Sequence, residues 1–234
     1  MHTALITGGS KGFGLAVATS LVKDGWSVVV DGRDRAVLDA AVASLQAESH
    51  GQAVRGIAGD VADPAHRAGL VKAVTELGQL DLLVNNASTL GPSPLPRLAE
   101  FPLQELEHVL AVNLVAPLAL IQAVLPLLRT SRGTVIDITS DAGVEGYAGW
   151  GGYGSSKAAL EQLSNVLAAE ESDVRVYWFD PGDMRTEMHQ AAFPGEDISD
   201  RPLPETVVPA FRHLLATAPP SGRFRAAELQ EATP

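Results

Sequence analysis

The chain has 234 residues, a length that suits one α/β domain whose core needs neither disulfides nor a structural metal. It contains no cysteine, which excludes disulfides, thiolate catalysis and cysteine-ligated zinc. Its formal net charge of −11 makes nucleic acid a poor partner, because phosphate binding needs a basic surface.

Short apolar segments alternate along the chain with segments whose apolar residues repeat at helical spacing. The predicted strands are residues 4–7, 27–30, 53–58, 80–84, 134–139, 174–179 and 222–226. The predicted helices are residues 13–23, 36–48, a helix opened by Pro64, 100–128 with a bend near Pro117, 154–170 and 204–216. This alternation predicts an α/β fold, in which a doubly wound parallel sheet of about seven strands carries helices on both faces.

Two segments are predicted to lack stable regular structure. Residues 190–201 combine Pro194 and Gly195 with several acids and are expected to form a mobile loop, and residues 228–234 are expected to fray. The N-terminus lacks the basic and apolar regions of a signal peptide, and the apolar stretch at 114–128 is too short to span a bilayer. We therefore expect a cytoplasmic protein with no membrane partner.

A glycine-rich turn at residues 7–14 follows the first predicted strand and precedes a helix. A dinucleotide fingerprint requires this context, because glycine lets the pyrophosphate approach the backbone and the helix N-terminus offers free N–H donors. The spacing is Gly-x-x-x-Gly-x-Gly rather than the commoner Gly-x-Gly-x-x-Gly. A tight turn without a ligand is the structural alternative.

The same turn also matches Gly-x-Ser-x-Gly, the nucleophile elbow of hydrolases, with Ser10 as the nucleophile. Too few residues precede it for an earlier strand and loop to supply the second oxyanion donor. The sequence therefore favours dinucleotide binding over ester hydrolysis.

Tyr153 and Lys157 stand four residues apart on a predicted helix and so share one face. A free tyrosine has a pKa near ~10, and a neighbouring ammonium group is expected to lower that pKa by favouring the phenolate. Ser140 ends a predicted strand at the sheet edge where such folds bind ligands, so its hydroxyl is placed to hold a substrate oxygen. A lone Tyr–Lys pair at this spacing is more often structural than catalytic, but the glycine turn and the strand-end serine shift the balance toward acid/base chemistry.

Taken together, these motifs resemble the short-chain dehydrogenase/reductase family, in its compact single-domain branch. The resemblance runs from residue 7 to at least residue 186 and implies one Rossmann domain over residues 1–234. The further matching pieces are Asp60-Val61, Asn85-Asn86-Ala87, Asn113 and Pro181-Gly182-Asp183-Met184-Arg185-Thr186. One departure is Ser88, where the family pattern has glycine; it touches no proposed chemical group, so we do not interpret it as a loss of activity.

The resemblance implies a role for each matching residue. Tyr153 would exchange the proton, Ser140 would orient the carbonyl, and Lys157 would bind ribose and tune Tyr153. Asn113 would hold a water in the proton relay. The implied cofactor contacts are Gly8, Ser10, Lys11, Gly12, Phe13, Gly14, Arg33, Asp60, Val61, Asn86, Ala87, Tyr153, Lys157, Pro181, Gly182 and Thr186.

The end of the second predicted strand bears on the choice between NADP and NAD. An acid there binds the ribose 2′-hydroxyl, whereas an arginine favours a 2′-phosphate. By resemblance, the acid of NAD-preferring members falls at Gly32, and Arg33 and Lys11 match NADP-preferring members. We therefore expect NADP(H), with NAD(H) as the alternative if Asp31 points inward.

The resemblance implies an oxidoreductase that interconverts a ketone or aldehyde and an alcohol by hydride transfer. Residues 184–201 would close over a small-molecule substrate, and Tyr147 and Trp150 would line its entrance or serve in packing. The helices at 100–129 and 154–170 would build a homodimer or homotetramer. No metal is expected, because the six histidines form no helix-spaced ligand pair. A non-catalytic redox sensor is the alternative, although the complete set of catalytic residues favours an enzyme.

Overall fold

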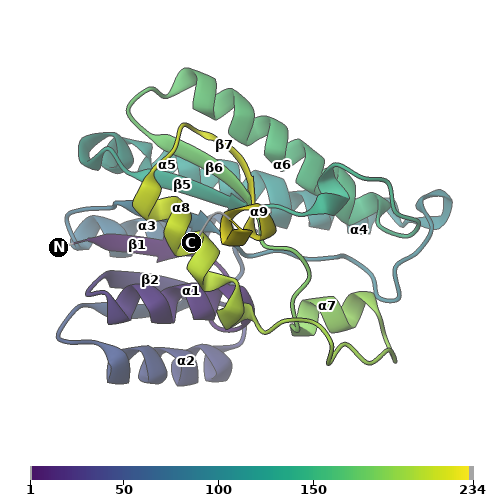
Figure 1. Ribbon diagram of the computed structural model, residues 1–234, viewed down its shortest axis with the longest axis horizontal. Coiled ribbons are helices and arrows are strands. Elements are labelled where there is room, and N and C mark those ends of the chain that lie inside the picture. The colour runs from purple at the N-terminus through teal and green to yellow at the C-terminus, as the bar shows by residue number, and fades with distance from the viewer. Residues whose placement is uncertain (1, 232–234) are drawn as a thin grey trace.

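Seven parallel strands form a single sheet in the order β3-β2-β1-β4-β5-β6-β7 (Figure 1). The strands are β1 Thr3–Ile6, β2 Ser27–Gly32, β3 Val54–Ala58, β4 Leu82–Asn85, β5 Thr134–Ile138, β6 Arg175–Asp180 and β7 Gly222–Arg225. The computed structural model describes residues 2–231, and side chains as far as residue 229. The strand order reverses direction between β1 and β4, which opens a ligand crevice at the carboxyl ends of the strands.

Helices follow most of the strands, as the alternating sequence pattern predicts. They are α1 Gly12–Lys23, α2 Arg35–Glu48, α3 Pro64–Glu76, α4 Leu103–Leu110, α5 Ala116–Ser131, α6 Gly151–Glu170, α7 Glu187–Ala192, α8 Val208–Thr217 and α9 Ala226–Glu231. Local sequence sets the start of two of them. Asp34 caps α2 and Asp63 caps α3 by accepting backbone N–H groups, and Pro64 occupies the first turn of α3.

The apolar core lies on both faces of the sheet. Within β1, Ala4 and Ile6 pack in one cluster with α1, α2 and α8, whereas Leu5 belongs to the opposite cluster with α3 and α5. Figure 1 shows α1, α2 and α8 on the near side of the sheet and α3 and α5 behind it. Because helices cover both faces of the sheet, nearly every residue of the inner strands is buried. The sequences of these strands are therefore nearly continuous apolar runs.

The predicted helix at 100–128 is divided in the structure. A π-helical turn at Ala111–Val115 joins α4 to α5, and Pro117 stands in the first turn of α5. The irregularity therefore precedes Pro117 and surrounds Asn113. Leu103–Ser131 is long and apolar enough to cross a membrane by length and composition alone, and its buried residues pack against the sheet.

The predictions for two other segments differ in part from the structure, which places residues 193–201 outside any helix or strand. The expected mobile loop at 190–201 includes the end of α7, and Thr186 caps that helix by accepting the N–H of His189 at 3.1 Å. Arg185 donates its N–H to Pro202 at 2.8 Å, which closes the segment at its base. Residues expected to fray belong to α9 as far as 231, and residues 232–234 lie outside the described residues.

Candidate active site

A cavity of about 540 Å³ lies at the carboxyl ends of the strands, a volume typical of small-molecule sites. Its walls extend from the glycine turn to α7, which Figure 1 shows beyond the strand ends. All predicted cofactor contacts except Gly14 line it, together with Ser140, Tyr153 and Lys157. Asn113 is the predicted catalytic residue that does not.

The glycine turn forms a cradle at one end of the cavity. Gly8 and Gly12 have φ of +64° and +57°, a conformation that favours glycine. A Cβ on Gly14 would lie 2.4 Å from the carbonyl oxygen of Gly8, so Gly14 serves the packing of the turn rather than the cavity wall. Asn86 Nδ2 donates to the carbonyls of Thr7 and Gly8 at 2.9 and 3.1 Å, which fixes the turn against β4. The residues present fit a dinucleotide diphosphate, because the turn keeps the N-terminus of α1 open to the cavity.

The acid at the end of β2 is engaged by the protein itself. Asp31 Oδ1 accepts the N–H of Gly8 at 2.6 Å, and its Oδ2 lies 2.9 Å from Nε2 of His66 on α3. The side chains of Asp31 and His66 are only 2% and 4% exposed. Asp31 therefore holds the glycine turn. No local sequence pattern predicts this pair, because its two partners are 35 residues apart.

Two exposed cations line the mouth of the same cavity. Arg33 follows β2, and Lys11 lies in the glycine turn. Lys11 Nζ forms an ion pair with Glu187 of α7, so the turn and α7 are joined across the cavity.

Tyr153 and Lys157 are both buried on α6. Lys157 Nζ lies 5.4 Å from the centroid of the Tyr153 ring and donates to the carbonyl of Ile138 at 2.7 Å. Burial lowers the pKa of Lys157 to about 8, because the charged form loses hydration, while Asp137 and Glu161 oppose the shift.

The expectation that Lys157 lowers the pKa of Tyr153 was wrong. Burial of the phenol raises that pKa above its ordinary value, hydrogen bonding to Ser140 lowers it in part, and the charges of Asp180 and Asp141 raise it further. Desolvation is the largest cause of the shift, and the structure favours a protonated phenol.

The side chain of Asn113 is fully engaged within the protein. Its Oδ1 accepts from the N–H of Thr89 at 2.8 Å and from Ser88 Oγ at 3.1 Å. Its Nδ2 donates to the carbonyl of Thr89 and to Ser156 Oγ, both at 2.9 Å. Both amide hydrogens are used, so the side chain has no free donor for the expected relay water.

The interpretation of Ser88 also needs correction. Its hydroxyl donates to Asn113 Oδ1 at 3.1 Å, so it contacts a group of the proposed chemistry, and Ser88 also lowers the pKa of Tyr153 in part. Ser140 accepts the N–H of Ala142 at 3.2 Å and donates to Asp141 at 3.0 Å, which holds its hydroxyl at the end of β5.

Sequence reasoning missed a buried acid beneath the site. Asp137 accepts from Asn85 Nδ2 and from Ser164 Oγ, both at 2.7 Å, and burial raises its pKa. Its charge acts on Lys157. An acid inside the otherwise apolar strand at 134–139 was the available signal, because a buried carboxylate needs partners.

Replacement of Lys157 by Met is expected to remove a pH dependence of folding stability. Since the folded pKa is about 8 and that of an unfolded lysine is ~10.4, the unfolded chain binds more protons between these values. The penalty for burying this lysine is therefore fully present below pH ~8 and is relieved as the pH rises toward ~10. Between pH 7 and pH 10, the stability advantage of Lys157→Met over the parent, measured by urea unfolding, should shrink by up to about 3 kcal/mol. Lys72→Met, which alters a lysine that is 78% exposed, is the control and should leave the slope unchanged.

Comparison with known proteins agrees with this architecture. The family model for short chain dehydrogenases matches residues 2–197. The serine 3-dehydrogenase of Agrobacterium fabrum is 36% identical over 189 residues, which cover 79% of this chain and 73% of that protein. The sepiapterin reductase of Mus musculus is 35% identical over 199 residues, or 80% and 76% of the two chains. A solved short chain dehydrogenase from Shigella flexneri, complexed with NADP, is 30% identical with a TM-score of 0.89 and covers 97% of both chains.

Proposed function

Because the chain belongs to the short chain dehydrogenase family, we propose that it transfers a hydride between NADP(H) and a small ketone or aldehyde and its alcohol. One observation carries this proposal. A single cavity joins the glycine turn to the hydroxyls of Ser140 and Tyr153, so a dinucleotide and a carbonyl group would meet at one sheet edge.

The nicotinamide cofactor, when bound, supplies or accepts the hydride. The turn at Gly8 and Gly12 would hold its diphosphate, and Asp60 and Val61 would contact its adenine. Lys157 would bind its ribose, and Thr186 its carboxamide. Each of these residues lines the cavity.

The protein's own residues would then manage the proton. Ser140 holds the substrate oxygen beside Tyr153, and the Tyr153 hydroxyl donates a proton to it during reduction. A phenol with the ordinary pKa of ~10 is protonated at neutral pH, and because burial raises the pKa of Tyr153, this donor is protonated there too. The side-chain donors of Asn113 are committed to Thr89 and Ser156, so its amide group would not donate to a relay water.

Three features support NADP(H) over NAD(H). Arg33 and Lys11 are exposed at the cavity, where a 2′-phosphate would gain charge-assisted hydrogen bonds. Asp31 is committed to Gly8 and His66, which withdraws the strand-end carboxylate from the ribose. Solved relatives from Shigella flexneri and Escherichia coli are complexed with NADP and NADPH.

The substrate end of the cavity is largely apolar. Leu90, Trp150 and Met188 contribute to its wall, and Phe193 packs against Trp150. This lining suits a carbonyl compound with an apolar body. The two relatives named above are named after different substrates, so the substrate of this chain has to be identified by a screen of carbonyl compounds.

Assembly and location remain predictions. Leu103, Val115 and Leu118 are exposed apolar residues on the helical stretch that contains α4 and α5, which supports a homodimer or homotetramer built on that surface. We retain the expectation of a cytoplasmic protein.

Fluorescence titration with NADPH and, separately, NADH tests the proposal, with Trp150 at the cavity as a reporter. We expect tighter binding of NADPH. A screen of carbonyl compounds for NADPH oxidation follows from that result. Tighter NADH binding would keep the enzyme and reverse the cofactor assignment, whereas binding of neither would reopen the hydrolase alternative at Ser10.

A further inference from the structure

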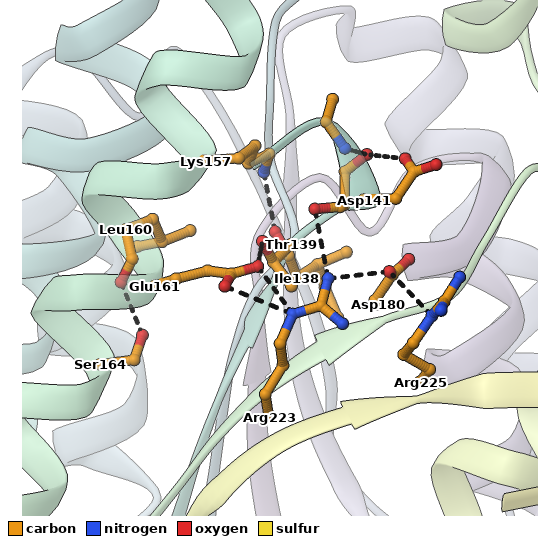
Figure 2. Close-up of polar contacts among 12 residues, drawn as sticks. Ile138, Thr139, Asp141, Lys157, Leu160, Glu161, Ser164, Asp180, Arg223 and Arg225 are labelled. Carbon is orange, nitrogen blue, oxygen red and sulfur yellow. Dashed lines mark hydrogen bonds and ion pairs between the residues drawn. The ribbon is translucent and has the colours of Figure 1, made fainter. Parts of the chain in front are cut away.

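Arg223 on β7 contacts groups from three other parts of the fold, and Figure 2 shows its guanidinium group between Glu161 and Asp180. Its Nε donates to Glu161 Oε1 on α6 at 3.1 Å. Its Nη2 donates to Asp180 Oδ2 on β6 at 3.0 Å and to the carbonyl oxygen of Ser140 at 3.4 Å. One guanidinium group therefore ties α6 and β6 to the end of β5.

The carboxylate of Asp180 is the buried partner in this cluster. It is 4% exposed, and its Oδ1 accepts the N–H of Gly182 at 3.0 Å at the cavity edge. Arg223 is 24% exposed, whereas Arg225 is 51% exposed and its Nε lies 3.8 Å from the same carboxylate. Arg223 is thus the main counter-charge, and its loss would leave a buried charge poorly compensated.

Charged groups act on Tyr153 from several elements. Lys157 approaches from α6, Asp141 lies after β5 and Asp180 ends β6. His189 of α7 lines the same cavity. Both carboxylates disfavour the phenolate, and Asp180 lines the same cavity as Tyr153, so a cation that neutralises Asp180 favours release of the Tyr153 proton.

We propose that Arg223 is a positioning residue of this site: it neutralises Asp180 beside Tyr153 and fixes the strand end that carries Ser140. The inference rests on the proposed function and deepens it. β7 lies outside residues 2–197, the range that the family model matches, so the match assigns no role to Arg223.

Ultraviolet absorbance of tyrosinate, titrated against pH, tests this role without a substrate. Subtracting the spectrum of the corresponding Tyr153→Phe protein isolates the absorbance change of Tyr153. Each titration is carried out with and without NADP⁺. We expect Asp180→Asn to lower the ionisation midpoint toward that of a free tyrosine and Arg223→Met to raise it further above that value. The double variant should return close to the parent, because both charges are then absent.

Two further variants separate charge from structure. Arg223→Lys keeps the cation, so its Tyr153 ionisation midpoint should stay near that of the parent. Arg225→Met removes the outer, exposed arginine and should shift this midpoint far less than Arg223→Met does. If Arg223→Met does not fold, Asp180→Asn and Arg223→Lys still decide the question. An unchanged midpoint in Asp180→Asn, or equal shifts for Arg223→Met and Arg225→Met, would overturn the proposal. If the parent protein does not bind NADP⁺, the proposed function is refuted. The order of the Tyr153 ionisation midpoints among the variants can still be measured in that case.

Discussion

Replacement of Tyr153 by Phe is expected to reduce carbonyl reduction by about 10²- to 10⁴-fold, the usual contribution of a positioned acid/base group. The ring is buried and packs edge-on against Trp150, so phenylalanine preserves the packing and removes only the hydroxyl. NADPH affinity should change little, because the glycine turn and Lys157 remain. Steady-state NADPH oxidation and a fluorescence titration measure the two effects on the same preparation.

Tyr147 provides a matched control for this experiment. It stands near the same sheet edge, is 42% exposed and bonds to Asp141 and Glu145. Tyr147→Phe should retain most of the activity. Unchanged turnover in Tyr153→Phe would exclude the acid/base role, and a parent protein that binds NADPH without any turnover would favour the redox-sensor alternative.

Replacement of Arg33 by Asp is expected to reverse the cofactor preference. Arg33 is exposed at the cavity immediately after β2, where a carboxylate would repel a 2′-phosphate and accept a ribose hydroxyl. A charge-assisted hydrogen bond contributes about 1.5 to 3 kcal/mol, so the ratio of NADPH to NADH affinity should fall by about 10- to 100-fold. Parallel titrations with both cofactors measure this ratio.

Arg35 offers a control for the same change of charge. It is the first residue of α2, is exposed and does not line the cavity. Arg35→Asp should leave the affinity ratio near that of the parent. If Arg33→Asp also leaves the affinity ratio near that of the parent, Arg33 does not bind the 2′-phosphate. Lys11 is then the residue to replace next.

The sequence by itself determined the elements and the central motifs of the site. Each of these signals is local. A strand, a glycine turn and a helix follow one another over residues 3–23, and Tyr153 and Lys157 share a face because residues four apart on a helix are neighbours. The alternation of apolar strands and amphipathic helices predicted the parallel sheet, since crossover helices must bury their apolar faces on it. The family resemblance added the remaining site residues, and all but Gly14 and Asn113 line one cavity.

The tertiary structure alone decided how these groups are partnered and charged. Asp31 meets Gly8 and His66 across 23 and 35 residues, and Arg223 meets Ser140 across 83. No local periodicity encodes such contacts, because they depend on how strands and helices pack. Burial likewise raises the pKa of Tyr153, where the sequence predicted a fall, since the loss of hydration depends on every element packed around the phenol.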